Sequence, residues 1–434
     1  MKPGWVSDMA RTCTAVVLMT ASVAWTDDFA IVERPWAASN DPVARMWQRW
    51  QLGEFKPALS NAKACVASVL AELKLSPASQ TLVFSKTSLQ NSAIDPQSPR
   101  SVFFNEECYV GWAQGGVLEI IGMDPETGPR FYSLTLPGAG GGRPELRTTE
   151  LCLSCHQGPR TGGVPGMLVR SVYTGESGQP MLNEGSLVTG HDSPLRDRWG
   201  GWYVTGKHGT ERHRGNSFAQ RRGPRISFDY EAGANVTTLE RYFPTERYLA
   251  PGSDIVALMV LEHQCAMHNK LTDAARSTRE ALARQREAQQ RAKEPVTDVP
   301  QGSALAVIHE QAEAVVRHLL FCGEYALKDA VIGDPAYQEA FRRTRVATKD
   351  GRSLKDFELR TRLFQHRCSY MIYSRGFEAL PSAVKQAIYR RLHDVLTGKD
   401  QGGSFAHLSA AERRNIREIL QETKADLPGD WGRE

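Results

Sequence analysis

The sequence has no long apolar run, no strong excess of charge and no repeat at a fixed period. Beyond the first residues, no stretch approaches the ~18 consecutive apolar residues of a membrane-spanning helix. The 434 residues carry a net charge of only +4, with basic and acidic residues interspersed, so nothing indicates nucleic-acid binding. The mature chain is therefore expected to be soluble and globular, with two or three domains by its length.

Several motifs that would define an enzyme class are also absent. No Gly-x-Ser-x-Gly nucleophile elbow occurs, which argues against a Ser-His-Asp hydrolase. The glycine run at residues 138–142 is not followed by Lys-Ser or Lys-Thr, so it is interpreted as a flexible linker and not as a phosphate-binding loop. A second Cys-x-x-Cys, which a structural zinc site would normally require, is missing as well.

What the sequence does contain is a Cys-x-x-Cys-His motif formed by Cys152, Cys155 and His156. This is the attachment pattern of a c-type haem. On a first helical turn, the two sulfurs can each form a thioether with one vinyl edge of a porphyrin, and the next residue then projects under the iron. His156 is predicted to be the proximal iron ligand, because a neutral imidazole nitrogen is a good donor to iron.

The alternatives for this motif are accidental spacing, part of a zinc site and a redox dithiol. With 8 Cys and 11 His in the chain, independent placement would produce the five-residue pattern in roughly one such chain in a few hundred. We therefore predict one covalently attached haem c, with its iron, as the cofactor.

The N-terminal residues 1–24 have the features of a secretory signal. Lys2 and Arg11 precede an uncharged, mostly apolar stretch that ends in Ser22-Val23-Ala24, a small-x-small cleavage pattern. The run is too short to span a membrane comfortably. Export agrees with haem attachment, which in bacteria generally takes place outside the cytoplasm. The sequence thus predicts a periplasmic protein without a membrane span after signal removal.

Removal of the signal also removes Cys13 and leaves seven cysteines. Five lie outside the haem motif: Cys65, Cys108, Cys265, Cys322 and Cys368. An odd number in an oxidising compartment requires at least one free thiol and leaves room for one or two disulfides, whose pairing stays open.

The hydrophobic patterning predicts an α+β fold with three regions after the signal. Residues 25–137 form a mixed lobe, with helical periodicity at 41–75 and then an antiparallel β-meander. The meander strands are expected at residues 81–84, 101–104, 108–112, 117–121 and 130–134. Residues 138–237 form a loop-rich haem region, and residues 238–434 a helical lobe.

Within the helical lobe, residues 254–270 carry an apolar stripe, whereas residues 276–293 are almost wholly charged or small. The second stretch is interpreted as a solvated helix or a linker. Further helices are predicted at residues 304–327, from Pro381, and from Ser409, where Ser409 and Glu412 match a capping box.

Arginines and tryptophans near the haem motif are candidates for cofactor contacts. Arg160 and Arg170 are candidate partners of the haem propionates, with solvated surface arginines as the alternative. Trp199 and Trp202 flank two glycines and are expected to pack on the porphyrin edge or simply in the core.

The sixth iron ligand stays open between methionine and histidine candidates. Met167 and Met181 follow the motif at short range, with apolar packing as the alternative. The histidines rank higher. His191, His208 and His213 lie in one aromatic-rich segment, and His263 lies on the apolar stripe of residues 254–270. His213, His208 and His263 are the preferred candidates for metal ligation, against exposed loop or core histidines.

Five segments of the chain resemble a group of secreted bacterial proteins described as cytochrome c domain-containing. They are residues 81–90 (TLVFSKTSLQ), 110–112 (VGW), 152–156 (CLSCH), 199–206 (WGGWYVTG) and 213–216 (HRGN). The resemblance runs from about residue 41 to the end. It implies an exported monohaem protein of mixed architecture and carries over the haem-binding role of Cys152, Cys155 and His156, but it implies no defined substrate.

These observations predict a periplasmic monohaem c-type cytochrome that transfers electrons to or from a periplasmic redox partner protein. One alternative is a haem enzyme acting on a small oxidant, like a peroxidase or a reductase, because the chain is about four times longer than an electron shuttle needs. Another is a non-catalytic haem sensor or partner-binding protein. The sequence leaves open whether the protein is an enzyme.

Overall fold

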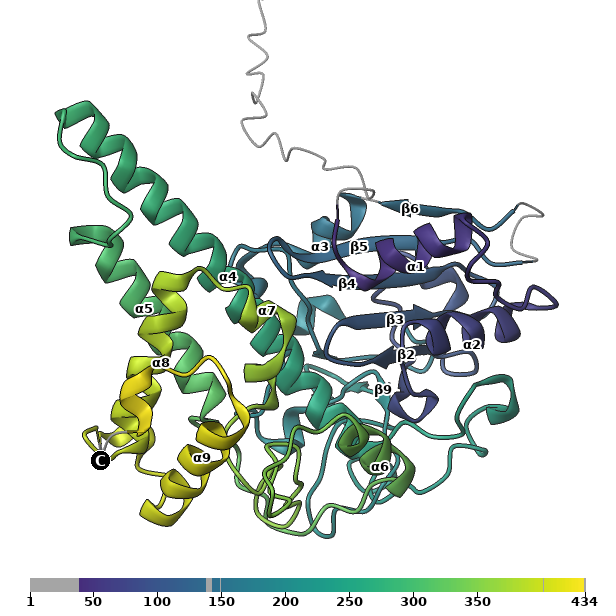
Figure 1. Cartoon of the computed structure of the whole chain (residues 1–434). Helices are drawn as coiled ribbons and strands as arrows, with labels where there is room; N and C mark the ends of the chain where they lie inside the picture. The colour runs from purple at the N-terminus through teal and green to yellow at the C-terminus, as the bar shows by residue number, and fades with distance from the viewer. Residues whose placement is uncertain (1–38, 138–142, 149, 401, 433–434) are drawn as a thin grey trace, which may run out of the picture. The chain divides into compact units, whose positions relative to one another are not determined.

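The structure is a computed structural model that describes residues 39–432 apart from 138–142, 149 and 401. The predicted signal segment 1–24, Cys13 and the glycine run 138–142 lie outside the described residues. Helices and antiparallel strands both occur, with a sheet in the N-terminal part and helices in the C-terminal part (Figure 1), which confirms the predicted α+β class.

The largest sheet has seven antiparallel strands in the order β6-β5-β4-β3-β2-β1-β9. Their bounds are β1 Thr81–Val83, β2 Arg100–Phe104, β3 Cys108–Trp112, β4 Leu118–Asp124, β5 Gly128–Leu134, β6 Leu146–Thr148 and β9 Trp202–Tyr203. The five strands of the predicted meander, β1 to β5, are thus confirmed, each paired with the next. At the β4–β5 turn, Asp124 Oδ1 accepts hydrogen bonds from the backbone N–H groups of Glu126 and Thr127.

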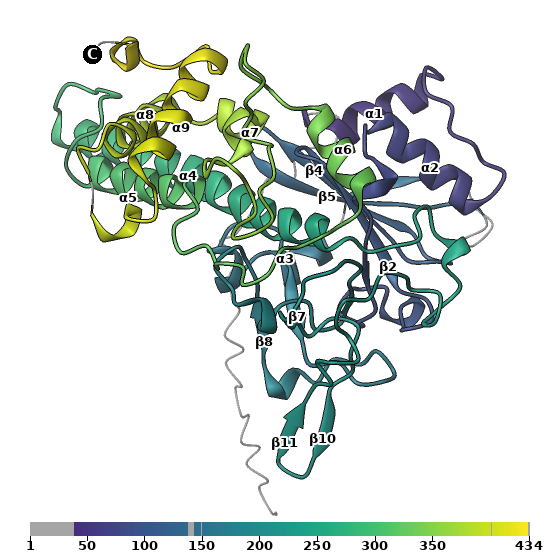
Figure 2. The ribbon, with the colours of Figure 1, turned by 90° about the horizontal axis from the view of Figure 1, so that it is seen from below.

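Both edge strands of this sheet come from the region predicted to be loop-rich. β6 pairs with β5, and β9 pairs with β1 through Leu82 opposite Tyr203. The sheet therefore combines strands from before and after the glycine run in the sequence. Residues 146–148 and 202–203 form its two edges. The same region forms two small hairpins, β7 (Arg170–Val172) with β8 (Ser186–Val188) and β10 (Gln220–Arg222) with β11 (Arg225–Ser227), visible in Figure 2.

One face of the sheet is covered by the two N-terminal helices, α1 (Pro42–Gln51) and α2 (Ala62–Glu72), as Figure 1 shows. Alternation along the strands directs one set of side chains to this side. The resulting core contains Met46, Val66, Val69, Phe103, Val110, Leu118 and Tyr132. Asp41 caps α1 by accepting hydrogen bonds from the backbone N–H groups of Val43 and Ala44.

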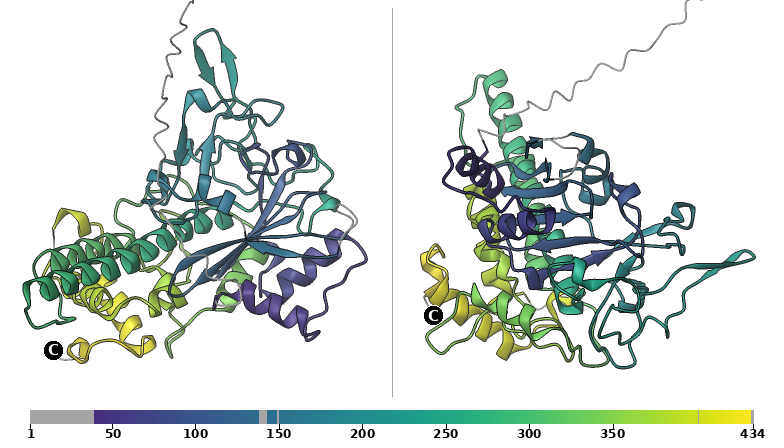
Figure 3. Two further views of the ribbon diagram at one scale, coloured as in Figure 1. Left: turned by 90° about the horizontal axis from the view of Figure 1, so that it is seen from above. Right: turned by 90° about the vertical axis from the view of Figure 1, so that its right-hand side faces the viewer.

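The opposite face of the sheet meets the N-terminal half of α4 (Ile255–Ala292), the longest described helix. Tyr109 of β3 contacts His268 of α4, with Oη and Nδ1 2.9 Å apart. The other helices are α3 Leu153–His156, α5 Gly302–Leu319, α6 Pro335–Arg343, α7 Arg375–Glu378, α8 Ser382–Leu396 and α9 Ala410–Thr423. Helices α4 and α5 lie side by side in both views of Figure 3.

The predicted helices 254–270 and 276–293 form one continuous helix, α4. Its charged half carries a pair between Arg276 Nε and Glu280 Oε1 at 2.6 Å, while Ala281 and Leu282 are buried, so it is a packed helix and not a linker. The prediction of helix over residues 304–327 is wrong at its C-terminal end. Helix α5 stops at Leu319, and Phe321 adopts a positive φ of 55°, which a continuing right-handed helix does not allow.

Helix α9 begins as predicted, since Ser409 Oγ accepts a hydrogen bond from the backbone N–H of Glu412 at 3.2 Å. The Glu412 carboxylate, however, binds Arg367, whose Nε lies 2.9 Å from Oε1. The cap thus fixes the start of α9, and its acidic residue ties α9 to the preceding loop.

No helix within the described ranges has the length and apolarity needed to cross a membrane. The seven cysteines from Cys65 onward are all free thiols in this structure. Four of them, Cys65, Cys108, Cys265 and Cys368, are buried, so they contribute to the cores as small apolar side chains.

Candidate functional site

The Cys-x-x-Cys-His motif lies on a short helical segment, where a turn at Glu150–Cys152 leads into α3. Cys152 is partly buried and Cys155 is exposed, and both are free thiols. Residues three apart in a helix lie on the same side, so the two sulfurs are presented together, as covalent attachment of one flat group requires. Burial raises the pKa of the Cys152 thiol to about 11.

His156 is held by a backbone carbonyl. Its Nδ1 lies 2.8 Å from the oxygen of Gly166, to which Nδ1–H donates a hydrogen bond, and its ring packs on Phe131 with the centroids 4.9 Å apart. Burial lowers the pKa of His156, which favours the neutral ring. With the proton on Nδ1, the lone pair is on Nε2, the arrangement of a metal-ligating histidine.

The carbonyl that holds His156 is itself positioned by α4. Asn269 Oδ1 accepts a hydrogen bond from Met167 N, and Asn269 Nδ2 donates one to Met167 O, both at 2.8 Å. A Cβ at Gly166 would lie 2.4 Å from Asn269 Oδ1, so only glycine permits this close approach. Asn269 therefore fixes the loop that orients the imidazole.

Beside the motif is a cavity of about 1190 Å³, a volume that includes its open mouth. Its walls include Cys152, Cys155 and His156, and its floor is the sheet face opposite α1 and α2. Each of β1 to β5 contributes at least one apolar or small residue to the lining, among them Val83, Val102, Gly111, Ile121 and Phe131. Leu261 and Cys265 of α4 line it as well.

Gly111 lies in the middle strand of this floor. It is in β3, where the alternation of side chains would otherwise direct a Cβ into the cavity. Such a Cβ would lie 3.6 Å from atoms of Arg100 and Glu119. The glycine thus leaves room in the middle of the floor, where a larger side chain would project into the cavity.

Two arginines bring buried, unsatisfied donors to the cavity. Arg100 pairs with Glu119, whose Oε1 also accepts a hydrogen bond from Ser88 Oγ at 2.6 Å, and Arg170 donates from Nη2 to Ser186 Oγ at 3.0 Å. The Nε atoms of Arg100 and Arg170 are buried without a hydrogen-bond partner. A buried N–H group without a partner is costly, so these donors fit a ligand that carries carboxylates.

The carboxyl of Glu119 is ionised by its neighbours. Burial alone would raise its pKa, but Arg100 and the hydrogen bonds from Ser88 and Gln90 outweigh burial and lower it. The cavity floor therefore combines apolar residues with one fixed ion pair.

The residues present thus fit a c-type haem: two thiols, an oriented imidazole, a floor with many apolar residues and buried donors for acidic groups. No protein-family model, curated protein or solved structure gives a significant match to the chain. The assignment of the site consequently depends on its own geometry.

The structure brings only some of the predicted site residues to this cavity. Arg170 lines it, as do Met167 and Trp202, whereas Arg160 is exposed and is not among the described lining residues. Trp199 is buried in the core beside His213. Met181 lies on a separate surface depression. Met167 follows Gly166 directly, so its backbone lies on the side of His156 that faces away from Nε2.

His208 and His213 form a pair of their own, with ring centroids 4.7 Å apart. Both nitrogens of His208 are engaged: Nδ1–H donates to Glu211 O, and Nε2 accepts from Asn235 N, each at 2.9 Å. Burial lowers the pKa of His213 to about 3. Neither residue is among the described residues that line the cavity, and the geometry assigns them to the packing of their own loop.

His263 does not line the cavity within the described part of the chain either. It projects from the other side of α4 and meets His191 and His318. Sequence reasoning named His191 and His263 separately and missed His318. These residues lie 72 and 55 positions apart along the chain, and no local pattern connects them.

Sequence reasoning also missed Arg100, Gly111, Glu119 and Asn269. A signal was present for Glu119, which is the one charged residue in the otherwise apolar run Leu118-Glu119-Ile120-Ile121. A charge at that position of a central strand indicates either an ion pair or a site. For Asn269, on a long helix, the sequence offers no comparable signal.

Proposed function

We propose that the chain binds one haem covalently in this cavity and transfers electrons in the bacterial periplasm. The observation that carries the proposal is that Cys152, Cys155 and an oriented His156 open onto one cavity whose floor carries many apolar residues. A haem bound there would supply an iron that accepts and releases one electron. The proposed partner is a periplasmic redox protein.

Each group around the cavity has a definite task in this function. Cys152 and Cys155 would form the two thioethers, and His156 Nε2 would ligate the iron. The free Nε donors of Arg100 and Arg170 would bind carboxylates of the cofactor. The floor of the cavity would exclude water through the apolar side chains of Val83, Val102, Ile121 and Phe131. Exclusion of water is one of the factors that set the reduction potential of a bound metal centre.

The rim of the cavity supports exchange of electrons with another protein. Leu89 and Leu151 line the cavity and are 58% and 69% exposed. Apolar side chains at an open edge permit close contact with a partner that buries them on docking. A deeply enclosed site would not offer such an edge.

One observation favours a second function, catalysis on a small oxidant. Among the described lining residues, His156 is the one histidine and Met167 the one methionine, and Met167 follows the carbonyl behind His156. With no further histidine among these residues to ligate the iron, a bound haem could still accept a small ligand, and the ion pair of Arg100 with Glu119 lines the same cavity. The guanidinium of Arg100 could bind a small anionic substrate there.

The first test is haem attachment in cells that carry a cytochrome c maturation system. We expect one haem per chain that survives denaturation, and none in Cys152→Ala/Cys155→Ala. Cys322→Ala, which removes a partly buried thiol outside the motif, is the matched control and should retain the haem. Unaltered protein that carries no covalent haem after expression in these cells would disprove the proposal.

The second test separates the two functions. Visible spectra of the oxidised and dithionite-reduced protein are recorded with and without carbon monoxide. A low-spin spectrum that carbon monoxide does not change supports electron transfer through a six-coordinate iron. A high-spin spectrum that shifts with carbon monoxide supports the open site and thus catalysis.

A further inference from the structure

A second group of potential ligands lies apart from the cavity, where His191, His263 and His318 converge. They come from a loop, from α4 and from α5, and their side chains are 5%, 0% and 8% exposed. One ring nitrogen of each lies within 4.8 Å of one ring nitrogen of the other two. Three buried histidines that meet from three separate segments form a set of neutral nitrogen donors.

The spacing of the nitrogens is close to that of a metal site. His191 Nδ1 and His263 Nδ1 are 2.9 Å apart. Zinc binds imidazole nitrogens at about 2.0–2.1 Å, so two ligands of a tetrahedral ion lie about 3.3 Å apart. At 2.9 Å one proton must lie between the two Nδ1 atoms, and a metal ion that replaces it would separate them by only a few tenths of an ångström.

The remaining ring nitrogens are engaged on the outside of the cluster. His263 Nε2 lies 2.7 Å from Ser369 Oγ, and His318 Nε2 lies 3.1 Å from the backbone oxygen of His263. The backbone of Cys322 interacts with the His191 ring. Metal-ligating histidines almost always use the second nitrogen in this way, since the outer hydrogen bond fixes the tautomer and the ring.

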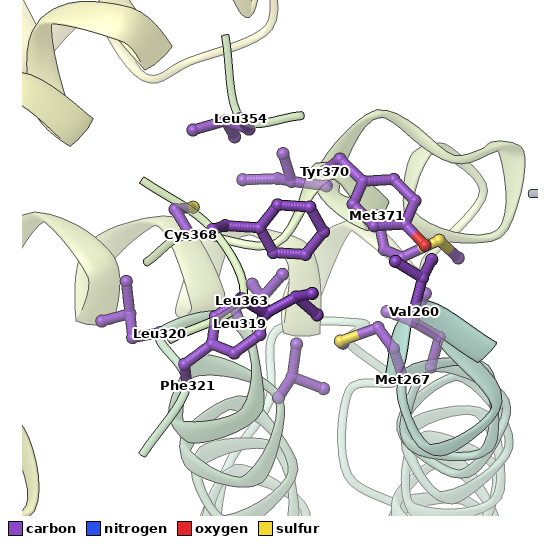
Figure 4. Packing of buried hydrophobic residues seen from close by; sticks show 14 of the residues in the cluster. Val260, Met267, Leu319, Leu320, Phe321, Leu354, Leu363, Cys368, Tyr370 and Met371 are labelled. Atoms are coloured by element: carbon purple, nitrogen blue, oxygen red, sulfur yellow. The ribbon is translucent and has the colours of Figure 1, made fainter. Parts of the chain in front are cut away.

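The surroundings keep these histidines neutral and dry. Burial lowers the pKa of all three, to about 4 for His191. The ring of Phe321 stacks on His263 with the centroids 4.2 Å apart. Figure 4 shows Phe321 among Leu319, Leu363 and Cys368 at the end of α5. Uncharged imidazoles in an apolar shell present lone pairs at neutral pH and select transition metals over calcium or magnesium.

We propose that His191, His263 and His318 bind one divalent transition-metal ion of the zinc class through their Nδ1 atoms. In the metal-free arrangement the rings are stacked, with planes 4° to 29° apart. Binding therefore requires the rings to turn about χ2, a torsion with a broad energy profile in histidine, and the outer hydrogen bonds to adjust with them. The fourth position is left to a water or another small ligand. The ion would tie the loop at His191 to α4 and α5.

This inference does not depend on the haem, because none of the three histidines lines the cavity in the described part of the chain. The test uses the full-length protein after dialysis against a chelator, with Zn²⁺ as the probe. We expect one equivalent to bind, a rise of the unfolding temperature with zinc, and X-ray absorption at the zinc edge that shows three nitrogen ligands at about 2.0–2.1 Å. The zinc edge is distinct from that of haem iron.

The variants are His191→Gln, His318→Gln and the control His309→Gln, an exposed histidine on the same helix as His318. We expect zinc affinity to fall at least about 100-fold in the first two and to stay unchanged in the control. Ser369→Ala, which keeps all three ligands, should weaken binding about 10- to 100-fold and remains informative if a histidine variant fails to fold. Absence of stoichiometric zinc in the unaltered protein, or equal binding by all variants, would overturn the proposal.

Discussion

At the scale of single residues, the cavity floor is defined by one glycine and one ion pair. Gly111 leaves the middle of the floor empty, while Arg100 and Glu119 place opposite charges beside it. The pair is partly shielded from water, since the Arg100 side chain is 22% exposed and that of Glu119 25%. An ion pair so placed contributes more than one on the surface, and removal of one partner leaves the other charge uncompensated.

We predict a pH-dependent loss of stability for Glu119→Gln. The pKa of Glu119 is lower in the folded chain than in the unfolded one, so its ionised form stabilises the fold at neutral pH, and this contribution is lost as the pH falls through the folded-state pKa. The Glu119→Gln variant lacks this stabilising contribution at every pH. Its free energy of unfolding should be lower than that of the unaltered protein by on the order of 2 kcal/mol at pH 7, and the difference should shrink below about pH 4.

Urea unfolding at several pH values measures this difference. Glu145→Gln removes an exposed partner of Arg147 on the β6 side of the sheet and is the control, for which no measurable change is expected. A difference that stays constant from pH 7 to pH 3 would show that the charge of Glu119 does not contribute.

At the scale of elements, α4 positions the loop that holds His156. The amide of Asn269 makes two hydrogen bonds of 2.8 Å to the backbone of Met167. Buried backbone groups need hydrogen-bond partners. In this irregular loop no neighbouring strand of the described chain supplies them to Met167, and the side chain of Asn269 does so instead.

We expect Asn269→Ala to lower the free energy of unfolding by about 1–3 kcal/mol, because it leaves the N–H and C=O groups of Met167 unpaired. Asn269→Asp retains the oxygen that accepts a hydrogen bond from Met167 N. Its free energy of unfolding should therefore lie between those of Asn269→Ala and the unaltered protein. Asn183→Ala, at an exposed position, should change stability by less than about 0.5 kcal/mol. Chemical denaturation followed by circular dichroism measures all three, and an effect of Asn269→Ala no larger than that of Asn183→Ala would contradict the role of this clamp.

The elements that the sequence predicted are those with local signals. Strands β1 to β5 follow from short apolar runs between turn residues, and α9 follows from its Ser409 cap. The stop of α5 depends on the positive φ of Phe321, which no composition rule indicates. The three-histidine cluster depends on contacts between residues 55 and 72 positions apart, beyond any local pattern.

At the scale of the whole molecule, the three regions that the sequence separated contribute strands and helices to common structural elements. The sheet takes β6 and β9 from residues after the glycine run, and α4 covers the face of the sheet that carries Tyr109. Of the residues that line the candidate site, the sequence pointed to the motif, Met167, Arg170 and Trp202. The floor of the cavity could not be predicted, because it exists only once five strands are aligned.

We predict that residues 39–137 expressed alone will not fold cooperatively. This fragment lacks both edge strands and the helix that contacts Tyr109, so it exposes apolar surface on one face and unpaired backbone groups at its edges. Thermal unfolding monitored by circular dichroism tests this, with residues 39–434 as the reference. A sharp two-state transition of the fragment would show that the lobe is autonomous.

Helix α4 presents Leu261 and Cys265 to the cavity and, between them, His263 to the three-histidine cluster. Neighbouring residues of one helical turn do not rotate independently, so a small rotation of α4 that suits an occupant of one site is imposed on the other. The affinity at each proposed site would then depend on the occupancy of the other. By thermodynamic linkage, this dependence would be equal in both directions. The second and third turns of α4 thus couple the two centres mechanically.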